Sequence, residues 1–316
     1  MNQQTLASTH GLDAIVIGAA AMDMMAWVEH LPVKDGIVLA RQVEIQPGGA
    51  GANVAVAVAR LGFKVGFIAR LSTDENGRTL LNSISQEGID TRACHIVSDL
   101  PTAVCFIAID SSGDRSMVAL GGAGPIETSV ELDPGYLAGA RLVYLTDVQP
   151  HIFHIVAEIA HAQNSLLIFS PGGILASGGL EPLVTVLPHV DVLLLSWSES
   201  NSLFPNYLPG QAAKELFARG ARNVVITLGK QGVLCVSSEQ SFSVPAFPVD
   251  TVVDTTGAGD ALAGGLLAGL LCGKSLKDSI RYGCAAAAIK VGHPGARSGL
   301  PSRKQLELFL SSYPKE

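Results

Sequence analysis

Short apolar runs alternate along this chain with longer segments whose apolar residues recur at helical spacing. The short runs are rich in branched and aromatic side chains, which favours buried strands at residues 14–18, 65–69, 142–146, 166–170, 191–196 and 223–229. The longer segments favour helices at residues 52–61, 74–87, 151–162, 211–219, 259–272, 275–290 and 302–312. This alternation predicts an α/β fold with a mainly parallel central sheet and helices on both of its faces.

Two segments interrupt the alternation of strands and helices. Residues 33–46 are strand-forming with no helix behind them, and residues 102–120 favour a hairpin around the sequence SSGD. We expect both segments to form a small antiparallel sheet that projects from the main body, although edge strands of the main sheet are the alternative. No internal repeat or long linker divides the chain, so we expect a single domain over residues 1–316.

The composition excludes some classes of partner. Hydrophobic residues make up 48% of the 316 residues and charged residues 16%, which provides for a large core. The net charge is −7, and binding to nucleic acid or an anionic membrane requires a basic surface. We therefore expect neither nucleic acid nor membrane as a partner.

The cysteines and the apolar runs indicate the compartment. The five cysteines contain no C-x-x-C pair and are odd in number, which is typical of free thiols in a reducing environment. The N-terminal residues lack the features of a signal peptide, and the apolar runs are shorter than the ~20 residues that span a bilayer. These features predict a cytoplasmic protein.

A glycine-rich segment, DTTGAGD at residues 254–260, opens one of the predicted helices. Free backbone amides at a helix N-terminus attract anions, and glycine lets the backbone approach an anion closely. Gly257, Ala258 and Gly259 could therefore bind a phosphoryl group, and Asp260 could remove the proton from an attacking hydroxyl. The alternative is a helix with an acidic first turn and glycines that serve packing.

A second glycine-rich segment, at residues 47–62, also precedes an apolar helix. It could bring backbone amides against a polar ligand, with Asn53 as both donor and acceptor. A dinucleotide fingerprint that starts at Gly49 fails, because it needs glycine where Val54 stands. A Walker-type phosphate loop fails as well, because Ala268 replaces its first glycine. An NAD-dependent oxidoreductase is thus disfavoured.

The two segments together resemble the motifs of the ribokinase-like (PfkB) carbohydrate kinase family. The early motif stands here as GGAGAN at residues 48–53 and the late one as DTTGAGD at residues 254–260. The resemblance extends from Ile15 to the C-terminal helix. It implies the ribokinase-like fold, with ATP and Mg²⁺ used to phosphorylate a primary hydroxyl of a sugar or nucleoside.

The resemblance assigns the acceptor site and the reacting groups. Asp260 corresponds to the catalytic base, and Gly257, Ala258 and Gly259 correspond to the anion hole. Asp23 follows the first strand, where the family binds sugar hydroxyls. The resemblance adds Gly48, Gly49 and Asn53 to the acceptor site. The alternatives are a loop or cap role for Asp23 and a helix-capping side chain for Asn53.

The nucleotide side is assigned in the same way. Thr227, Gly229 and Gly232 match the family's T-x-G-x-x-G turn beside ATP. The family often has N-x-x-E after a central strand, where the acid holds Mg²⁺ through water. Here that place carries Ser196 and Glu199, so the acid is kept and the asparagine is replaced. The alternative for Glu199 is a helix-entry acid favoured by the helix dipole.

Two further features follow from the resemblance. Several relatives bind a monovalent cation such as K⁺, and Asp254 and Thr256 would contribute here, with carbonyl groups near Gly295 and Ser298. Residues 33–46 and 102–120 correspond to a lid over the sugar. The apolar face of that lid often meets a second subunit, so we expect a homodimer. Its exposed apolar residues would include Val104, Phe106 and Ile109.

The acceptor and the activity leave alternatives open. A phosphorylated sugar requires additional cations, for which Arg41, Arg70 and Arg115 are candidates. They form no tight basic cluster in the sequence, which favours an unphosphorylated sugar or a nucleoside. The substitution at Ser196 also leaves open a non-catalytic sugar- or nucleotide-binding regulator on the same fold.

Overall fold

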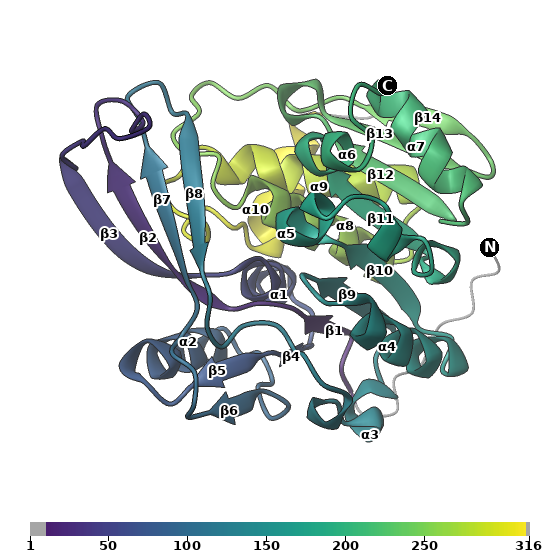
Figure 1. The fold of residues 1–316 in the computed structure, drawn as a ribbon. Helices are drawn as coiled ribbons and strands as arrows, with labels where there is room; N and C mark the ends of the chain where they lie inside the picture. Colours follow the sequence, from purple (N-terminus) through teal and green to yellow (C-terminus); the bar gives the residue numbers. More distant parts are fainter. Residues whose placement is uncertain (1–10, 314–316) are drawn as a thin grey trace.

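The computed structural model describes residues 11–313 and contains an eight-stranded central sheet (Figure 1). Its strand order is β14-β13-β12-β11-β10-β9-β1-β4. The pairings from β4 to β12 are parallel, and the β13–β14 hairpin adds an antiparallel edge. The strands are β1 Ala14–Ile17, β4 Val65–Ile68, β9 Leu142–Thr146, β10 Leu166–Ser170, β11 Val192–Ser196, β12 Asn223–Thr227, β13 Val233–Ser237 and β14 Ser241–Val244.

Two hydrophobic cores lie on opposite faces of this sheet. In β1, Ala14 and Val16 belong to one core, whereas Ile15 and Ile17 belong to the other. Since successive strand residues point to opposite faces, a continuous apolar run supplies both cores. This confirms the expected mainly parallel sheet with helices on both faces.

The helices divide between the two faces of the sheet. One core is covered by α1 Ala50–Arg60, α2 Glu75–Gln86, α8 Ala258–Leu271, α9 Leu276–Lys290 and α10 Arg303–Ser311. The other is covered by α3 Pro134–Leu137, α4 Pro150–Ala162, α5 Gly172–Ser177, α6 Trp197–Leu203 and α7 Pro209–Ala218. Short 3-10 turns lie at Ser129–Glu131, Glu181–Leu183, Leu187–His189 and Gly229–Gln231. Across residues 11–313, no helix combines the length and apolar character needed to cross a bilayer.

A small four-stranded sheet projects from the main body beside α1 and α2 (Figure 1). Its order is β3-β2-β7-β8, with two antiparallel pairings and one parallel pairing, β2–β7. The strands are β2 Ala21–Trp27, β3 Gln42–Gly48, β7 Val104–Ile109 and β8 Arg115–Leu120. The expected hairpin at 102–120 is therefore present, but the expected strand at 33–46 begins only at Gln42. A separate pair comprises β5 Arg70–Ser72 and β6 His95–Val97.

The two faces of the small sheet differ in character. Residues that pair directly across strands share a face, so Met24, Ile45, Phe106 and Val118 form one apolar row. The opposite face carries the polar residues that reach the main body, including Asp23 and Arg115. Ile109 pairs with Trp27 and Arg115 and so lies on this second face. The expectation that Ile109 shares an exposed face with Val104 and Phe106 is wrong, because an odd spacing along a strand reverses the side.

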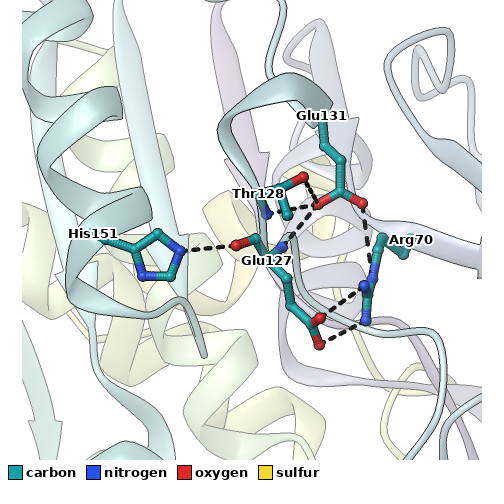
Figure 2. Close-up of polar contacts among 5 residues, drawn as sticks. All are labelled: Arg70, Glu127, Thr128, Glu131 and His151. Carbon is teal, nitrogen blue, oxygen red and sulfur yellow. Dashed lines mark hydrogen bonds and ion pairs between the residues drawn. The ribbon is translucent and has the colours of Figure 1, made fainter.

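An ionic network fixes the chain where it returns from the small sheet to the main body (Figure 2). The buried Arg70 guanidinium donates two hydrogen bonds to the Glu127 carboxylate, at 2.9 and 2.7 Å. Glu131 accepts from the Glu127 and Thr128 amides, at 2.9 and 2.8 Å, and lies 3.9 Å from Arg70 Nε. His151 on α4 donates to the Glu127 carbonyl at 2.8 Å. Arg70 thus has a structural role: it holds residues 127–131 against β5, and His151 holds them against α4.

Glycines bring α8 and α9 into close contact. A Cβ atom at Gly265 would lie 2.7 Å from the Tyr282 carbonyl oxygen, and one at Gly269 would lie 2.6 Å from the Ser279 Cα. On the other helix, a Cβ at Gly283 would lie 2.5 Å from the Leu262 carbonyl oxygen. Real Cβ atoms do not approach backbone so closely, so these positions require glycine.

We expect Gly265→Ala to destabilise the protein by roughly 1–3 kcal/mol, because the added methyl group forces two packed helices apart. Gly210→Ala in α7 is the matched control, since its Cβ would have only an ordinary contact, 3.9 Å from Leu234 Cδ2. Urea unfolding followed by circular dichroism measures both changes. Equal midpoints for Gly265→Ala and the parent protein would contradict the close packing.

Candidate active site

A cleft opens at the carboxyl ends of the parallel strands, where α/β sheets commonly bind ligands. Strands β9, β10, β11 and β12 and the first turn of α8 contribute to its walls. The lining residues are Ala50, Tyr144, Thr146, Asp147, Ser170, Gly172, Gly173, Leu194, Leu195, Ser196, Glu199, Thr227, Gly259 and Asp260. Of the predicted site residues, Ser196, Glu199, Thr227, Gly259 and Asp260 therefore meet in one cleft although they lie far apart in the sequence.

The late glycine motif forms an open helix N-terminus at this cleft. Gly257 has a left-handed φ of 76° and packs so tightly that a Cβ there would lie 2.6 Å from the Ala296 carbonyl oxygen. A Cβ at Gly259 would meet nothing within 4 Å, so the backbone there is open to a ligand. The Ala258 amide donates to the Thr255 carbonyl at 3.1 Å. In the described structure the amides free to bind an anion are those of Gly257, Gly259 and Asp260.

Asp260 belongs to a chain of side-chain hydrogen bonds that joins α8, α1 and the loop after α9. Asn53 on α1 donates through Nδ2 to Asp260 Oδ2 at 2.8 Å, and its Oδ1 accepts from Arg297 Nε at 2.7 Å. Arg297 also donates to the Gly48 carbonyl at 2.9 Å. Asn53 is buried inside α1, so it is not a helix cap. The Asn53–Asp260 bond therefore joins the two glycine motifs, and Arg297, which the sequence reasoning missed, fixes the early motif through Gly48 and Asn53.

Opposing effects set the pKa of Asp260. The pKa of Asp260 is raised above its ordinary value, because desolvation by the surrounding protein outweighs the Asn53 hydrogen bond and the Arg297 charge, which both lower it. A donated hydrogen bond stabilises the ionised form of a carboxyl group. Asn53 therefore favours the ionised state that a general base requires.

Asp23 lies in strand β2, close to the early glycine motif, and not in a loop or at a helix cap. A Cβ at Gly48 would lie 2.1 Å from Asp23 Oδ2, so only glycine leaves room for this carboxylate. Burial, followed by repulsion from Asp260, raises the pKa of Asp23 to about 7, and Arg297 opposes that rise. Asp23 and Asp260 are thus electrostatically coupled.

Gly49 serves the geometry of the α1 N-terminus. Its φ is 88°, and a Cβ there would lie 2.6 Å from the Ala21 amide nitrogen. This close approach brings the start of α1 against the beginning of β2 and places Asn53 near Asp260.

Ser196 and Glu199 cap the N-terminus of α6. The Ser196 amide donates to Glu199 Oε2 at 2.6 Å, and the Glu199 amide donates to Ser196 Oγ at 3.2 Å. This reciprocal arrangement is a capping box, for which serine is well suited. The serine at this position therefore has a local structural reason, and Glu199 combines its cap with a place in the cleft wall.

The turn after β12 is built around two glycines with positive φ. Gly229 has a φ of 56° and Gly232 a φ of 89°, and a Cβ at Gly232 would lie 2.1 Å from the Val244 carbonyl oxygen. Thr227 lines the cleft, whereas neither glycine does. Gly232 is thus required by the packing of this turn against β14.

Most of the chain resembles one known protein family. Residues 12–303 match the model of the pfkB family carbohydrate kinases. The chain belongs to the pfkB family. It is therefore a carbohydrate or nucleoside kinase.

Individual members of the family agree with this assignment. A ribokinase from Haemophilus influenzae is 32% identical over 301 residues, which cover 93% of this chain and 97% of that protein. A 2-dehydro-3-deoxygluconokinase from Bacillus subtilis is 29% identical, with coverages of 84% and 86%. The structure of Arabidopsis thaliana ribokinase complexed with ribose and ATP superposes with a TM-score of 0.83 at 25% identity, covering 95% of this chain and 99% of that chain. These similarities confirm the family and the fold expected from the two glycine motifs.

The cleft of this pfkB protein carries few protein ligands for a metal ion. Among residues 11–313, no group of three or more histidine, cysteine, aspartate or glutamate side chains is placed to hold one. Glu199 and Asp147 both line the cleft. Mg²⁺ keeps several waters and binds one or two carboxylates together with substrate phosphates, so these residues fit it.

Asp147 is a cleft residue that the sequence analysis missed. It directly follows β9 and has a positive φ of 57°. A Cβ at Gly172 would lie 2.0 Å from Asp147 Oδ1, so that glycine makes room for the carboxylate. Desolvation raises the pKa of Asp147 to about 7, with further contributions from Asp260 and Glu199. Its position at the end of a parallel strand was the available signal.

We expect Asp147→Asn to stabilise the protein at pH 8, raising the Tm by about 2–4 °C, and less at pH 5. The pKa of Asp147 is raised from 3.8 to about 7, so its folded form retains a proton that the unfolded chain releases. Stability is therefore lost as the pH rises from about 4 to about 7 in the parent protein and not in the variant. Asparagine also tolerates the left-handed φ.

Differential scanning calorimetry at the two pH values measures the effect of Asp147→Asn. Asp110→Asn is a control of opposite sign, because the Ser112 hydroxyl donates to this exposed carboxylate and lowers its pKa. A Tm difference between Asp147→Asn and the parent that shrinks as the pH rises would contradict the expectation.

Proposed function

We propose that this protein transfers the γ-phosphoryl group of ATP to a primary hydroxyl group of a sugar or nucleoside, with Mg²⁺. The observation that carries the proposal is the position of Asp260 in the cleft. It lies among free amides at the α8 N-terminus and accepts a hydrogen bond from Asn53 at 2.8 Å. A base beside an anion-binding helix terminus suits a reaction that deprotonates an alcohol as negative charge develops on a phosphoryl group.

The proposed reaction is a direct phosphoryl transfer. Asp260 takes the proton from the acceptor hydroxyl as its oxygen forms a bond to the γ-phosphorus. The bond from that phosphorus to the bridging oxygen breaks, and ADP leaves with the electron pair. The amides of Gly257, Gly259 and Asp260 stabilise the charge spread over the transferring group, a contribution typical of phosphoryl transfer.

The acceptor and the nucleotide are assigned to different sides of Asp260. The acceptor would bind near Asp23 and the early glycine motif, where a carboxylate can accept bonds from two hydroxyl groups. The nucleotide would bind along the Ser196, Glu199 and Thr227 side of the cleft. Glu199 would hold Mg²⁺ through water, and the ion would neutralise phosphate charge.

The small sheet would act as a lid over the acceptor. Asp23 and Arg115 lie on the same face of it, and Arg115 Nη1 donates to Thr256 Oγ1 at 3.2 Å. That face therefore already touches the late motif of the main body. Closing the lid would exclude water and so limit hydrolysis of ATP.

The arginines bear on the charge of the acceptor. Arg41 pairs with Glu29 at the surface, and Arg70 is engaged by Glu127. Only Arg115 of the three reaches the late motif. Arg297 beside Asp23 is already bonded to Asn53 and Gly48. With one of the three candidate arginines in place, an unphosphorylated sugar or a nucleoside is favoured, and Arg115 is the observation that supports a sugar phosphate as the second candidate.

We also propose that the protein is a homodimer formed through the outer face of the lid. The apolar row of Met24, Ile45, Phe106 and Val118 lies on the face opposite Asp23. Ile45 is 55% exposed and Val118 is 52% exposed. Exposed apolar rows of this kind mark interaction surfaces.

We expect Asp260→Asn to retain ATP binding and to lower kcat at least ~100-fold, because the amide cannot accept the proton. A panel of pentoses, hexoses, sugar phosphates and nucleosides in a coupled ADP-release assay first identifies the acceptor. The control is Asp99→Asn, an exposed carboxylate outside the cleft. Turnover of Asp260→Asn within a factor of ~2 of the parent would refute the base assignment. If no acceptor in the panel stimulates ATP consumption, the alternative of a non-catalytic sugar- or nucleotide-binding regulator is favoured.

For the dimer, Val118→Glu is expected to yield monomers, because it places a charge in the apolar row. Light scattering after gel filtration measures the mass. Val130→Glu is the control, since Val130 is 86% exposed and lies outside the small sheet. A parent protein that elutes as a monomer would rule out the dimer.

A further inference from the structure

A lysine is completely buried beneath the anion-binding end of α8. Lys290 is the last residue of α9 and is 0% exposed. Its ammonium group donates to the Asp254 carbonyl oxygen at 2.8 Å and to the His293 carbonyl oxygen at 3.2 Å. Burying a charge is costly unless it is paired, so this position requires a specific compensation by oxygen atoms.

The two carbonyl oxygens that accept from Lys290 belong to two segments, one that leads into the late motif and one that follows α9. Further hydrogen bonds join these segments. The Asp254 carboxylate accepts from the Thr256 amide at 2.8 Å and from the Gly295 amide at 2.7 Å. The Val253 and Asp254 amides donate to the Val291 carbonyl at 2.8 and 3.2 Å. Residues 253–254, which precede the rest of the late motif, are thereby hydrogen-bonded to the end of α9 and the loop after it.

Both segments lead directly to the reacting groups. After Asp254 the chain reaches Gly257, which packs against Ala296 of the loop after α9. The next residue of that loop, Arg297, donates to Asn53, which in turn donates to Asp260. Lys290 is therefore placed to fix the anion hole and the partner of the base together.

The monovalent cation was expected beside Asp254 and Thr256, and the oxygen atoms of these two residues are already used by other groups. A bound K⁺ requires several free oxygens in place of its hydration shell. Here each carboxylate oxygen of Asp254 accepts an amide, and its carbonyl accepts from Lys290. Arg115 donates to Thr256 Oγ1. An added cation would meet occupied oxygens and the repulsion of two charged side chains.

We propose that the Lys290 ammonium group replaces a bound monovalent cation and makes this kinase independent of K⁺. The inference rests on the proposed function for its kinetic readout. Lys290 is a positioning residue that touches neither nucleotide nor acceptor. It holds residues 254–257 against residues 293–297, so that the free amides and Asp260 keep their relative positions.

The test removes the lysine and supplies cations from solution. We expect the parent protein to change kcat by less than about twofold when tetramethylammonium chloride is replaced by KCl or NH₄Cl at equal ionic strength. Lys290→Ala should lose on the order of 10- to 100-fold in kcat, because a small displacement of reacting groups is costly. NH₄⁺ or K⁺ should restore part of that loss, and tetramethylammonium should not.

A second variant and a control separate charge from packing. Lys290→Met keeps the length of the side chain and removes the charge, so it should lose turnover without recovery by any cation. Lys304→Ala removes an exposed lysine of α10 and should behave as the parent. Recovery of Lys290→Met by K⁺ would contradict the assignment, because its side chain blocks the site of the ion.

Thermal stability provides a readout that does not depend on activity. A cation that binds only the folded state raises the Tm. KCl or NH₄Cl should therefore raise the Tm of Lys290→Ala relative to tetramethylammonium chloride and leave that of the parent unchanged.

Two outcomes would overturn the proposal. One is severalfold activation of the parent protein by K⁺. The other is a Lys290→Ala variant whose turnover and Tm show no response specific to small cations. A parent protein that phosphorylates no acceptor in any salt would instead refute the proposed function, and the Tm comparison would still decide the role of Lys290.

Discussion

The arrangement of this site depends on the hydrogen bonds that join Asp260, Asn53 and Arg297. Each residue comes from a different part of the chain, on α8, on α1 and on the loop after α9. The amide of Asn53 can donate to the acid and accept from the guanidinium at once, which a carboxylate or a hydrocarbon could not do. The link sets the direction of the carboxylate and favours its ionised form.

Glycine makes these connections sterically possible. Gly48 leaves room for the carboxylate of Asp23, and Gly257 lets the late motif rest on Ala296. Gly265 lets α9 approach α8 and so brings Lys290 and the loop after it beneath the anion hole. Because the backbones pack closely at these glycines, the charged groups beside them are held rigidly in the site.

The cleft gathers acids that repel one another. Desolvation and the charge of Asp260 raise the pKa of both Asp23 and Asp147 to about 7. Such carboxylates destabilise the fold near neutral pH, which is the usual cost of an active site. The positive charges of Arg297 and Lys290, the helix N-terminus and a bound Mg²⁺ would offset this excess of negative charge.

The sequence by itself determined the alternation of strands and helices, the fold class and the family. Apolar periodicity depends on residues that are close in the sequence. The residue types and spacing of the two glycine motifs can likewise be read from the sequence without the tertiary structure. Only the tertiary structure decided which distant residues contact one another. Strand β2 was missed because Asp23 interrupts its apolar run, and Arg297 and Lys290 gave no local sign of the residues 244 and 36 positions away that they contact. Hydrogen bonds over such separations exist only after folding brings the segments together.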